Sequence, residues 1–228
     1  MCDRASVNGD AVLSSPCRRR GLRIGLTGGI ASGKSTAAAI LRTAGCEVFS
    51  ADQAARAVLA PGSRCAADVA ARFPGAQGVA GQLDRPALAR VVFSDPVARA
   101  ALEAILHPRI LHLLNDQMES VQVDRPGLDV VVEAPLLFEA GMQRWFSVIV
   151  ALNAAPAQQA IRLQRRDGID AAAAQARIRA QMPSKVREAR SDIVISNDGD
   201  YGALAARMIQ LLSDLRAGMV GQTRAALN

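Results

Sequence analysis

Short, nearly continuous apolar runs alternate along this chain with longer segments of helical periodicity. The apolar runs predict buried strands at residues 22–27, 47–50, 128–133, 146–152 and 192–197. Strands that lack polar alternation are typical of a parallel sheet buried on both faces. Helices are expected at 34–44, 156–166, 171–182 and 200–216. The sequence therefore predicts an α/β fold with a parallel sheet covered by helices on both faces.

Residues 63–127 show no strand pattern but contain several helical stretches. Helices are expected in and just before this segment at 53–60, 64–72, 86–93 and 96–120. The third should begin after Asp84 and Pro86, and Ser94 should cap the fourth. Pro108 should kink that fourth helix. This much helix between two strands exceeds a simple crossover and predicts an inserted helical subdomain.

Composition fits a globular protein of one or two domains. Half of the 228 residues are apolar and 21% are charged, which excludes wholesale disorder. The net charge of +6 suits an anionic small substrate as well as a polyanion. Aromatic residues make up only 3%, a poor supply of stacking surfaces for single-stranded nucleic acid. No uninterrupted apolar stretch reaches about 18 residues, so no membrane span is expected.

The first residues and the cysteines bear on cellular context. Residues 1–20 have no periodicity and are expected to form a flexible tail without the apolar region of a secretory signal. The cysteines, Cys2, Cys17, Cys46 and Cys65, have neither CxxC spacing nor nearby histidines, which argues against a disulfide framework or a zinc site. Reduced thiols in a cytoplasmic protein are the simplest interpretation.

The strongest chemical signal is GGIASGKST, which satisfies G-x-x-x-x-G-K-S/T from Gly28 to Ser35. Glycines let a backbone curl around phosphate oxygens, and the helix that follows offers its N-terminal N–H groups. Lys34 can reach the β- and γ-phosphates of a nucleotide, and the Ser35 hydroxyl can bind Mg²⁺. The guanine-reading motif N/T-K-x-D and an LSGGQ-like signature are both absent from the sequence, which leaves mainly small-molecule kinases.

Asp52 follows the predicted strand 47–50. The carboxyl ends of parallel strands form the ligand crevice of α/β folds, so this carboxylate should face the transferred phosphate. It could orient an acceptor hydroxyl and accept its proton late in a loose transition state. The alternative is that Asp52 only caps the helix beginning at Gln53.

These residues, with others in order along the chain, resemble the dephospho-CoA kinase family. The matching segments are LTGGIASGKST, SADQAAR, VLAPGS, LHPRI, EAPLLFEAG, QRRD and SDIVISNDG, within residues 22–215. That family transfers the γ-phosphate of ATP to the ribose 3′-hydroxyl of dephospho-CoA, the last step of coenzyme A biosynthesis. The resemblance implies ATP and Mg²⁺ as cofactors and a P-loop kinase core with a helical substrate domain and a lid.

The resemblance also divides the chain and assigns site residues. The core would comprise 21–62, 128–155 and 192–228, the dephospho-CoA-binding insertion 63–127, and the lid 156–191. The phosphate-binding residues would be Gly28, Gly29, Ala31, Ser32, Gly33, Lys34, Ser35 and Thr36. Asp52 looks like the catalytic base. Many members have D-A-D where this chain has Ser50-Ala51-Asp52, so the first carboxylate is missing here.

The acceptor side of the site rests on the same resemblance. His107 would lie in the substrate domain, where direct substrate contact and helix packing are both open. Pro135 and Leu136 look like the wall of the acceptor pocket. Glu133 ends a strand and could support Mg²⁺ through water in an auxiliary role. His112 is expected to be an ordinary surface or core residue.

Arg162 and Arg166 share one face of the expected helix 156–166. The position resembles the lid of P-loop kinases, where arginines close over the triphosphate, with Arg166 the first choice as a catalytic residue. The alternative is a solvated basic face. Arg187 best matches the family on the return of the lid. Asn197 either lines the adenine pocket or makes a turn with Gly199.

Two other functions compete with dephospho-CoA phosphorylation. One is a nucleoside or nucleotide kinase on the same scaffold. The other, favoured only by the basic charge, is a nucleic-acid-binding ATPase, against which stand the scarce aromatics and the lack of a basic stripe. The expected partner is therefore the small-molecule acceptor, without nucleic acid or membrane, for a monomeric protein.

Overall fold

The computed structural model describes residues 21–78 and 82–218, so the predicted tail 1–20 lies outside the described residues. The strands in these ranges form one sheet in the order β2-β3-β1-β4-β5, and every neighbouring pair is parallel. Their bounds are β1 Arg23–Gly28, β2 Glu47–Ser50, β3 Val130–Glu133, β4 Val148–Asn153 and β5 Ile193–Ser196. The predicted parallel α/β sheet is confirmed, with strand ends displaced by at most two residues.

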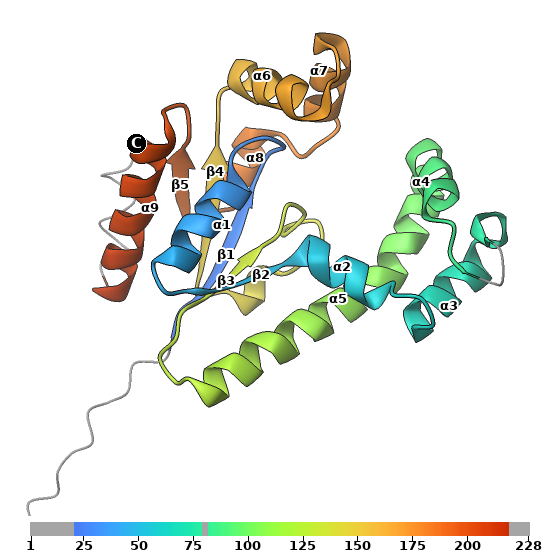
Figure 1. Ribbon diagram of the computed structural model, residues 1–228, viewed down its shortest axis with the longest axis horizontal. Coiled ribbons are helices and arrows are strands. Elements are labelled where there is room, and N and C mark those ends of the chain that lie inside the picture. The colour runs from blue at the N-terminus through green and yellow to red at the C-terminus, as the bar shows by residue number, and fades with distance from the viewer. Residues whose placement is uncertain (1–20, 79–81, 219–228) are drawn as a thin grey trace, which may run out of the picture.

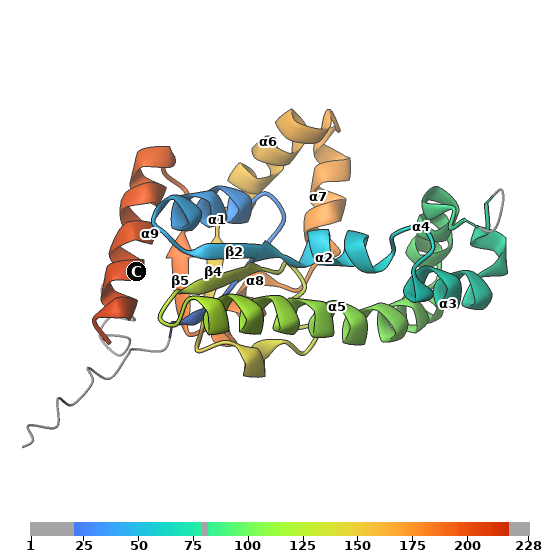
Figure 2. The ribbon, with the colours of Figure 1, turned by 60° about the horizontal axis from the view of Figure 1, so that its bottom comes forward.

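Helices cover both faces of the sheet, as the unbroken apolar strands require (Figure 2). Helices α1 (Lys34–Thr43) and α9 (Tyr201–Arg216) pack on one face, and α5 (Pro96–Asp124) packs on the other. The interior strand β3, second in the sheet, shows why these strands are apolar throughout. Val131 belongs to the core under α1 and α9, whereas Val130 and Val132 belong to the core under α5. Both faces of the sheet are buried under helices, so the residues that point to either face are apolar.

A second hydrophobic cluster lies away from the sheet, in what we call the helical arm. It comprises α3 (Arg64–Arg72), α4 (Arg85–Ser94), the short 3₁₀ helix Pro74–Ala76 and the first half of α5. Helix α2 (Ala51–Val58) connects the sheet to this arm (Figure 1). The arm coincides with the segment in which a helical subdomain is predicted; its boundaries stay a prediction.

The segment after β4 forms three helices near the carboxyl ends of the strands. Helix α6 (Pro156–Asp167) and α7 (Ala171–Arg179) make a hairpin, and α8 (Ser184–Ala189) leads back to β5 (Figure 1). The predicted helix 171–182 is wrong at its end, and α8 is not among the predicted helices. Met182 precedes Pro183, and a residue before proline is disfavoured in helical conformation. A turn therefore separates two helices.

One predicted helix start and one predicted cap are wrong, because neighbouring residues supply the caps. Helix α2 begins at Ala51, and the Ser50 Oγ accepts from the Gln53 N–H at 3.4 Å. Asp95, not Ser94, caps α5, since its carboxylate accepts from the Val97 N–H at 2.8 Å. Acceptors for the free N–H groups of a first turn define a cap, and these contacts are visible only in three dimensions.

Helix α5 continues through Pro108, so this proline does not end the helix. Proline removes one backbone donor from the helix interior. In the same turn the Arg109 guanidinium donates to the Ile105 carbonyl at 2.7 Å and pairs with Asp68 of α3. The Arg109–Asp68 pair therefore joins the turn that contains Pro108 to α3 of the helical arm. No helix within 21–78 and 82–218 is both long and apolar enough to cross a membrane.

Candidate active site

The phosphate loop joins the end of β1 to the start of α1. Gly28 and Gly33 have φ angles of 155° and 97°, and Ala31 reaches 56°. A Cβ atom at Gly33 would lie 2.1 Å from the Asn197 Nδ2 atom, so this close approach requires glycine. That Nδ2 donates to the Ser32 carbonyl at 2.8 Å. Asn197, which follows β5, therefore holds the phosphate loop in its curved conformation.

The Lys34 side chain is buried inside this loop. Its Nζ atom donates to the Gly28 carbonyl at 3.0 Å and to the Gly29 carbonyl at 2.8 Å, and the residue is 8% exposed. Burial lowers the pKa of the Lys34 ammonium to about 8. The loop therefore holds a positive charge that is poorly hydrated and available to an incoming anion.

Charged side chains from four other elements act on Lys34. The charges that shift its pKa, apart from burial, come from Glu133 at the end of β3, Arg187 in α8, Asp52 in α2 and Arg166 in α6. The two carboxylates raise the pKa of Lys34, and the two guanidinium groups lower it. Residues predicted from three distant motifs therefore act on a single ammonium group.

Ser35 lies one residue beyond Lys34 and contacts a carboxylate. Its hydroxyl donates to Glu133 Oε1 at 2.8 Å. The described residues contain no group of three or more histidine, cysteine or acidic side chains that could hold a metal ion. Mg²⁺ in kinase sites needs few protein ligands, because phosphate oxygens and water complete its octahedron. The oxygen donors of Ser35 and Glu133 fit such an ion.

Asp52 lies in the first turn of α2, one residue after Ala51. The capping alternative is wrong, because Ser50 provides the side-chain acceptor for this helix. This contact also gives a role to the serine that stands in place of the family's first aspartate. The Asp52 carboxylate lines a cavity between α2, α5 and the loop after β3.

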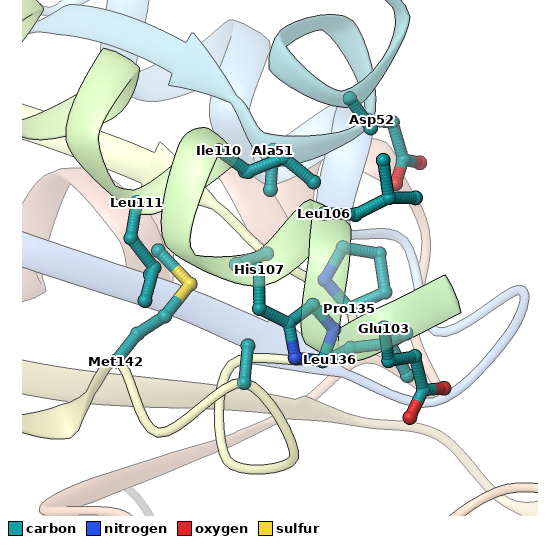
Figure 3. A pocket seen from close by; sticks show the side chains of 13 residues that line it. Ala51, Asp52, Glu103, Leu106, His107, Ile110, Leu111, Pro135, Leu136 and Met142 are labelled. Carbon is teal, nitrogen blue, oxygen red and sulfur yellow. The ribbon is translucent and has the colours of Figure 1, made fainter. Parts of the chain in front are cut away.

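That cavity has a volume of about 190 Å³ and brings together all the residues predicted to contact the acceptor: Asp52, His107, Pro135 and Leu136. Figure 3 shows the carboxylates of Asp52 and Glu103 on the right of the view and the apolar side chains of Leu111 and Met142 on the left. The walls are otherwise mostly apolar. Such a pocket can bind an organic acceptor and leave one carboxylate facing its reactive end.

Comparison with known proteins identifies the family of the chain. A family model described as dephospho-CoA kinase matches residues 22–202. The chain belongs to the dephospho-CoA kinase family. A dephospho-CoA kinase of Moorella thermoacetica is 45% identical over 80% of this chain and 87% of that protein. One from Anaeromyxobacter dehalogenans is 43% identical over 86% and 92%.

A solved structure supports the fold. The TT1252 protein of Thermus thermophilus is 35% identical, with a TM-score of 0.74 over 86% of this chain and 99% of that one. The chain is therefore a P-loop kinase core by both sequence and fold, and membership of this kinase family implies the use of ATP. The competing assignments to nucleoside kinases or nucleic-acid-binding ATPases are not favoured.

The two predicted phosphate-binding arginines of α6, Arg162 and Arg166, adopt different arrangements. The Arg166 guanidinium bonds to the carboxylate of its neighbour Asp167, with Nε to Oδ1 at 2.7 Å, and 60% of the side chain is exposed. Arg177 of α7 reaches the same carboxylate at 2.7 Å. These contacts hold the pKa of Asp167 below its usual range. Arg162 instead donates to the Asn197 carbonyl at 2.9 Å, so the face is not simply solvated.

A second cavity, of about 260 Å³, lies on the other side of the phosphate loop. Its lining includes Gly33, Thr36, Arg162, Asn197 and Tyr201. Asn197 lines it and also bonds to Ser32, a loop contact that neither alternative for this residue anticipated. The cavity adjoins the loop where the base of a bound nucleotide would extend.

Of the remaining residues considered from the sequence, Arg187 lies beside the phosphate loop and His112 lies away from it. Arg187 is 6% exposed and lies against the loop, since a Cβ atom at Gly29 would be 3.5 Å from its Nη1. Burial lowers the pKa of Arg187. His112 is at the surface, 3.4 Å from the Asp116 carboxylate, and is outside the site.

Sequence reasoning missed three polar residues around the site. Glu103 lines the acceptor cavity, Gln159 packs against the phosphate loop, and Gln181 accepts from the Ile30 N–H at 2.7 Å. Glutamines and isolated glutamates within helices carry no motif. Only the fold shows that they reach the site.

Proposed function

We propose that this protein transfers the γ-phosphate of ATP to the ribose 3′-hydroxyl of dephospho-CoA, yielding coenzyme A and ADP. The observation that carries the proposal is the position of Asp52. It lines the acceptor cavity and also acts electrostatically on Lys34 of the phosphate loop. A carboxylate between an organic pocket and a phosphate loop is placed to orient a hydroxyl for phosphoryl transfer.

The phosphate loop would hold the triphosphate of ATP. Its N–H groups and Lys34 would bind the phosphates, and the buried Arg187 would add a second fixed positive charge. The base would occupy the second cavity. Within the described ranges, the Arg162 Nη1 atom is buried without a hydrogen-bond partner, which supports a ligand acceptor at this cavity.

Mg²⁺ would bind through the Ser35 hydroxyl, with Glu133 in support. When bound there, Mg²⁺ would supply positive charge to offset the charge of the phosphates. The protein's own part is to hold the Ser35 oxygen 2.8 Å from the Glu133 carboxylate, ready to face the cation.

The cavity of about 190 Å³ would take the nucleoside end of dephospho-CoA. Leu136 and Pro135 would pack against it, and His107 lies on the same wall. Asp52 would hydrogen-bond to the 3′-hydroxyl, hold it in line with the γ-phosphate and accept its proton. The buried free thiols of Cys46 and Cys65 support a reducing, cytoplasmic location for this chemistry.

The test is an ADP-release assay with dephospho-CoA, adenosine 5′-monophosphate and adenosine as alternative acceptors. We expect kcat/KM for dephospho-CoA to exceed that for the others by at least about tenfold. Phosphorus NMR should identify a new 3′-phosphomonoester, and EDTA should stop turnover until Mg²⁺ is restored. Equal or faster turnover of adenosine 5′-monophosphate would instead identify a nucleotide kinase.

A further inference from the structure

The tip of the phosphate loop is part of the hydrophobic core of the lid. Ile30 and Ala31 pack against a cluster built from α6 and α7, whose buried members are Ala160, Leu163 and Ala174. Ala31 is also the non-glycine residue held at a φ of 56°. The loop therefore cannot change shape without disturbing the helices above it.

One polar contact joins the same two parts. Gln181 lies in the turn between α7 and α8, and its Oε1 accepts from the Ile30 N–H at 2.7 Å across 151 residues of sequence. The next residue, Met182, accepts at its carbonyl from the buried Arg187 at 2.8 Å. Arg187 in turn lies beside Gly29. The turn after α7 thus contacts Ile30 directly and reaches the neighbourhood of Gly29 through Arg187.

Gln181 and Lys34 bind opposite sides of one peptide unit. The N–H of Ile30 and the carbonyl of Gly29 belong to the same planar group. Gln181 accepts from that N–H at 2.7 Å, and the carbonyl accepts from Lys34 Nζ at 2.8 Å. Rotation of this peptide would break both contacts together, so each fixes the other.

We infer that Gln181 is a positioning residue that holds the Gly29–Ile30 peptide so that its carbonyl fixes the Lys34 ammonium for nucleotide phosphates. It also links the lid to the phosphate loop, so that the lid helices and the charged groups of the loop keep one arrangement. The inference rests on the proposed function in taking ATP as the ligand.

Gln181 acts on Lys34 through the Gly29–Ile30 peptide and carries no charge of its own. The charges that act on Lys34 from neighbouring elements are Glu133, Asp52, Arg187 and Arg166. Substitution at position 181 leaves all four in place.

The experiment compares wild type with Gln181→Met and Gln181→Glu. Methionine keeps the length and lacks a strong acceptor, whereas glutamate keeps an acceptor and adds a negative charge. Gln164→Met is the matched control, because Gln164 is a half-buried lid glutamine whose amide donates at 3.2 Å to a carbonyl of its own helix. Equilibrium binding of a non-hydrolysable ATP analogue is measured at one pH, together with kcat and with KM for ATP and for dephospho-CoA.

For Gln181→Met we expect about 3–10-fold weaker nucleotide binding, the value of one hydrogen bond. KM for ATP should rise with it, while KM for dephospho-CoA stays within about twofold. Gln181→Glu keeps an acceptor for the Ile30 N–H, so it should bind nucleotide more tightly than Gln181→Met. Gln164→Met should match wild type in all readouts.

Tighter nucleotide binding by Gln181→Met would overturn the inference, because Gln181 would then compete with phosphate for the Ile30 N–H. Unchanged nucleotide binding in Gln181→Met, or an equal loss in Gln164→Met, would also overturn it. If Gln181→Met does not fold, Gln181→Ala, which also lacks the acceptor, takes its place in the same measurements. Wild type that binds the ATP analogue but does not turn over dephospho-CoA would refute only the proposed function.

Discussion

The positive charges on the two sides of the nucleotide site are built differently. Lys34 and Arg187 are 8% and 6% exposed, and protein carbonyls hold both. Arg166 has 60% of its side chain in solvent and bonds to its sequence neighbour Asp167. Lys34 and Arg187 are therefore held in place before a nucleotide binds. Arg166 has to release the Asp167 carboxylate before it can bind a phosphate.

Lys34 and Arg187 are preorganised charges, already in position for a nucleotide. Arg166 is what we call a recruited charge, which must move to contact one. A buried, fixed cation needs no rearrangement in the transition state and acts in a poorly hydrated environment. If α6 and α7 form the proposed lid, an exposed arginine there would contribute only when the lid closes, and its partner Asp167 would compete with the phosphate. The phosphate-loop side should therefore dominate catalysis, and the lid side should adjust it.

The largest effect is expected from Lys34→Ala. It removes the fixed charge at the phosphates, so turnover should fall on the order of 10³-fold. The melting temperature should change little, because removal of a buried charge that folding has to desolvate offsets the loss of the donor to the Gly28 and Gly29 carbonyls. Lys185→Ala, an exposed lysine of α8, is the control and should remain near wild type. Near-normal turnover of folded Lys34→Ala would refute the phosphate-loop assignment.

Asp52→Asn should lower turnover on the order of 10²-fold while ATP binding persists. The amide keeps the shape of the carboxylate and cannot accept the acceptor's proton. Ser50 supplies the cap of α2, so helix content by circular dichroism should not change. A fall of less than about tenfold would remove Asp52 from the chemical step.

Arg187→Ala tests the fixed side for structure as well as catalysis. It removes a buried guanidinium and leaves the Met182 carbonyl without its donor. We expect a melting temperature lower by about 3–6 °C and kcat/KM for ATP lower by at least about tenfold. Thermal melts and steady-state kinetics measure the two. An unchanged melting temperature would mean that Arg187 belongs with the recruited charges.

Arg166→Ala should lower the single-turnover rate by about tenfold without lowering the melting temperature. Dephospho-CoA binding should stay near wild type, since the contact is to ATP phosphates. Arg177→Ala is the control, because Arg177 bonds to the same Asp167 carboxylate. Weaker dephospho-CoA binding with an unchanged single-turnover rate would move Arg166 into acceptor recognition.

The smallest effect is a pH dependence of nucleotide binding. With a pKa of about 8, Lys34 loses charge as pH rises, so affinity should fall about threefold between pH 7.5 and 8.5. The free energy of unfolding changes with pH in the opposite direction. The unfolded lysine titrates near 10.5, so the unfolded chain binds more protons between about 8 and 10.5, and stability rises with pH there. Lys34→Met should lack both trends in calorimetry and denaturant titration.

The sequence by itself determined the parts of this protein that depend on near neighbours. The apolar run of Val130–Glu133 predicts a buried strand, because a strand covered on both faces tolerates few polar residues. The glycine spacing from Gly28 to Lys34 predicts the phosphate loop, because a curled backbone excludes side chains at fixed positions. Local geometry is encoded within a few residues, so these predictions are confirmed.

The tertiary structure alone decided which remote residues meet. No spacing brings Ser35 to Glu133, or Gln181 to Ile30, because these pairs are 98 and 151 residues apart. Their contacts depend on strand order, on the turn before α8 and on the packing of the lid against the loop. Such distances follow from the sum of many weak contacts, which a local pattern does not contain.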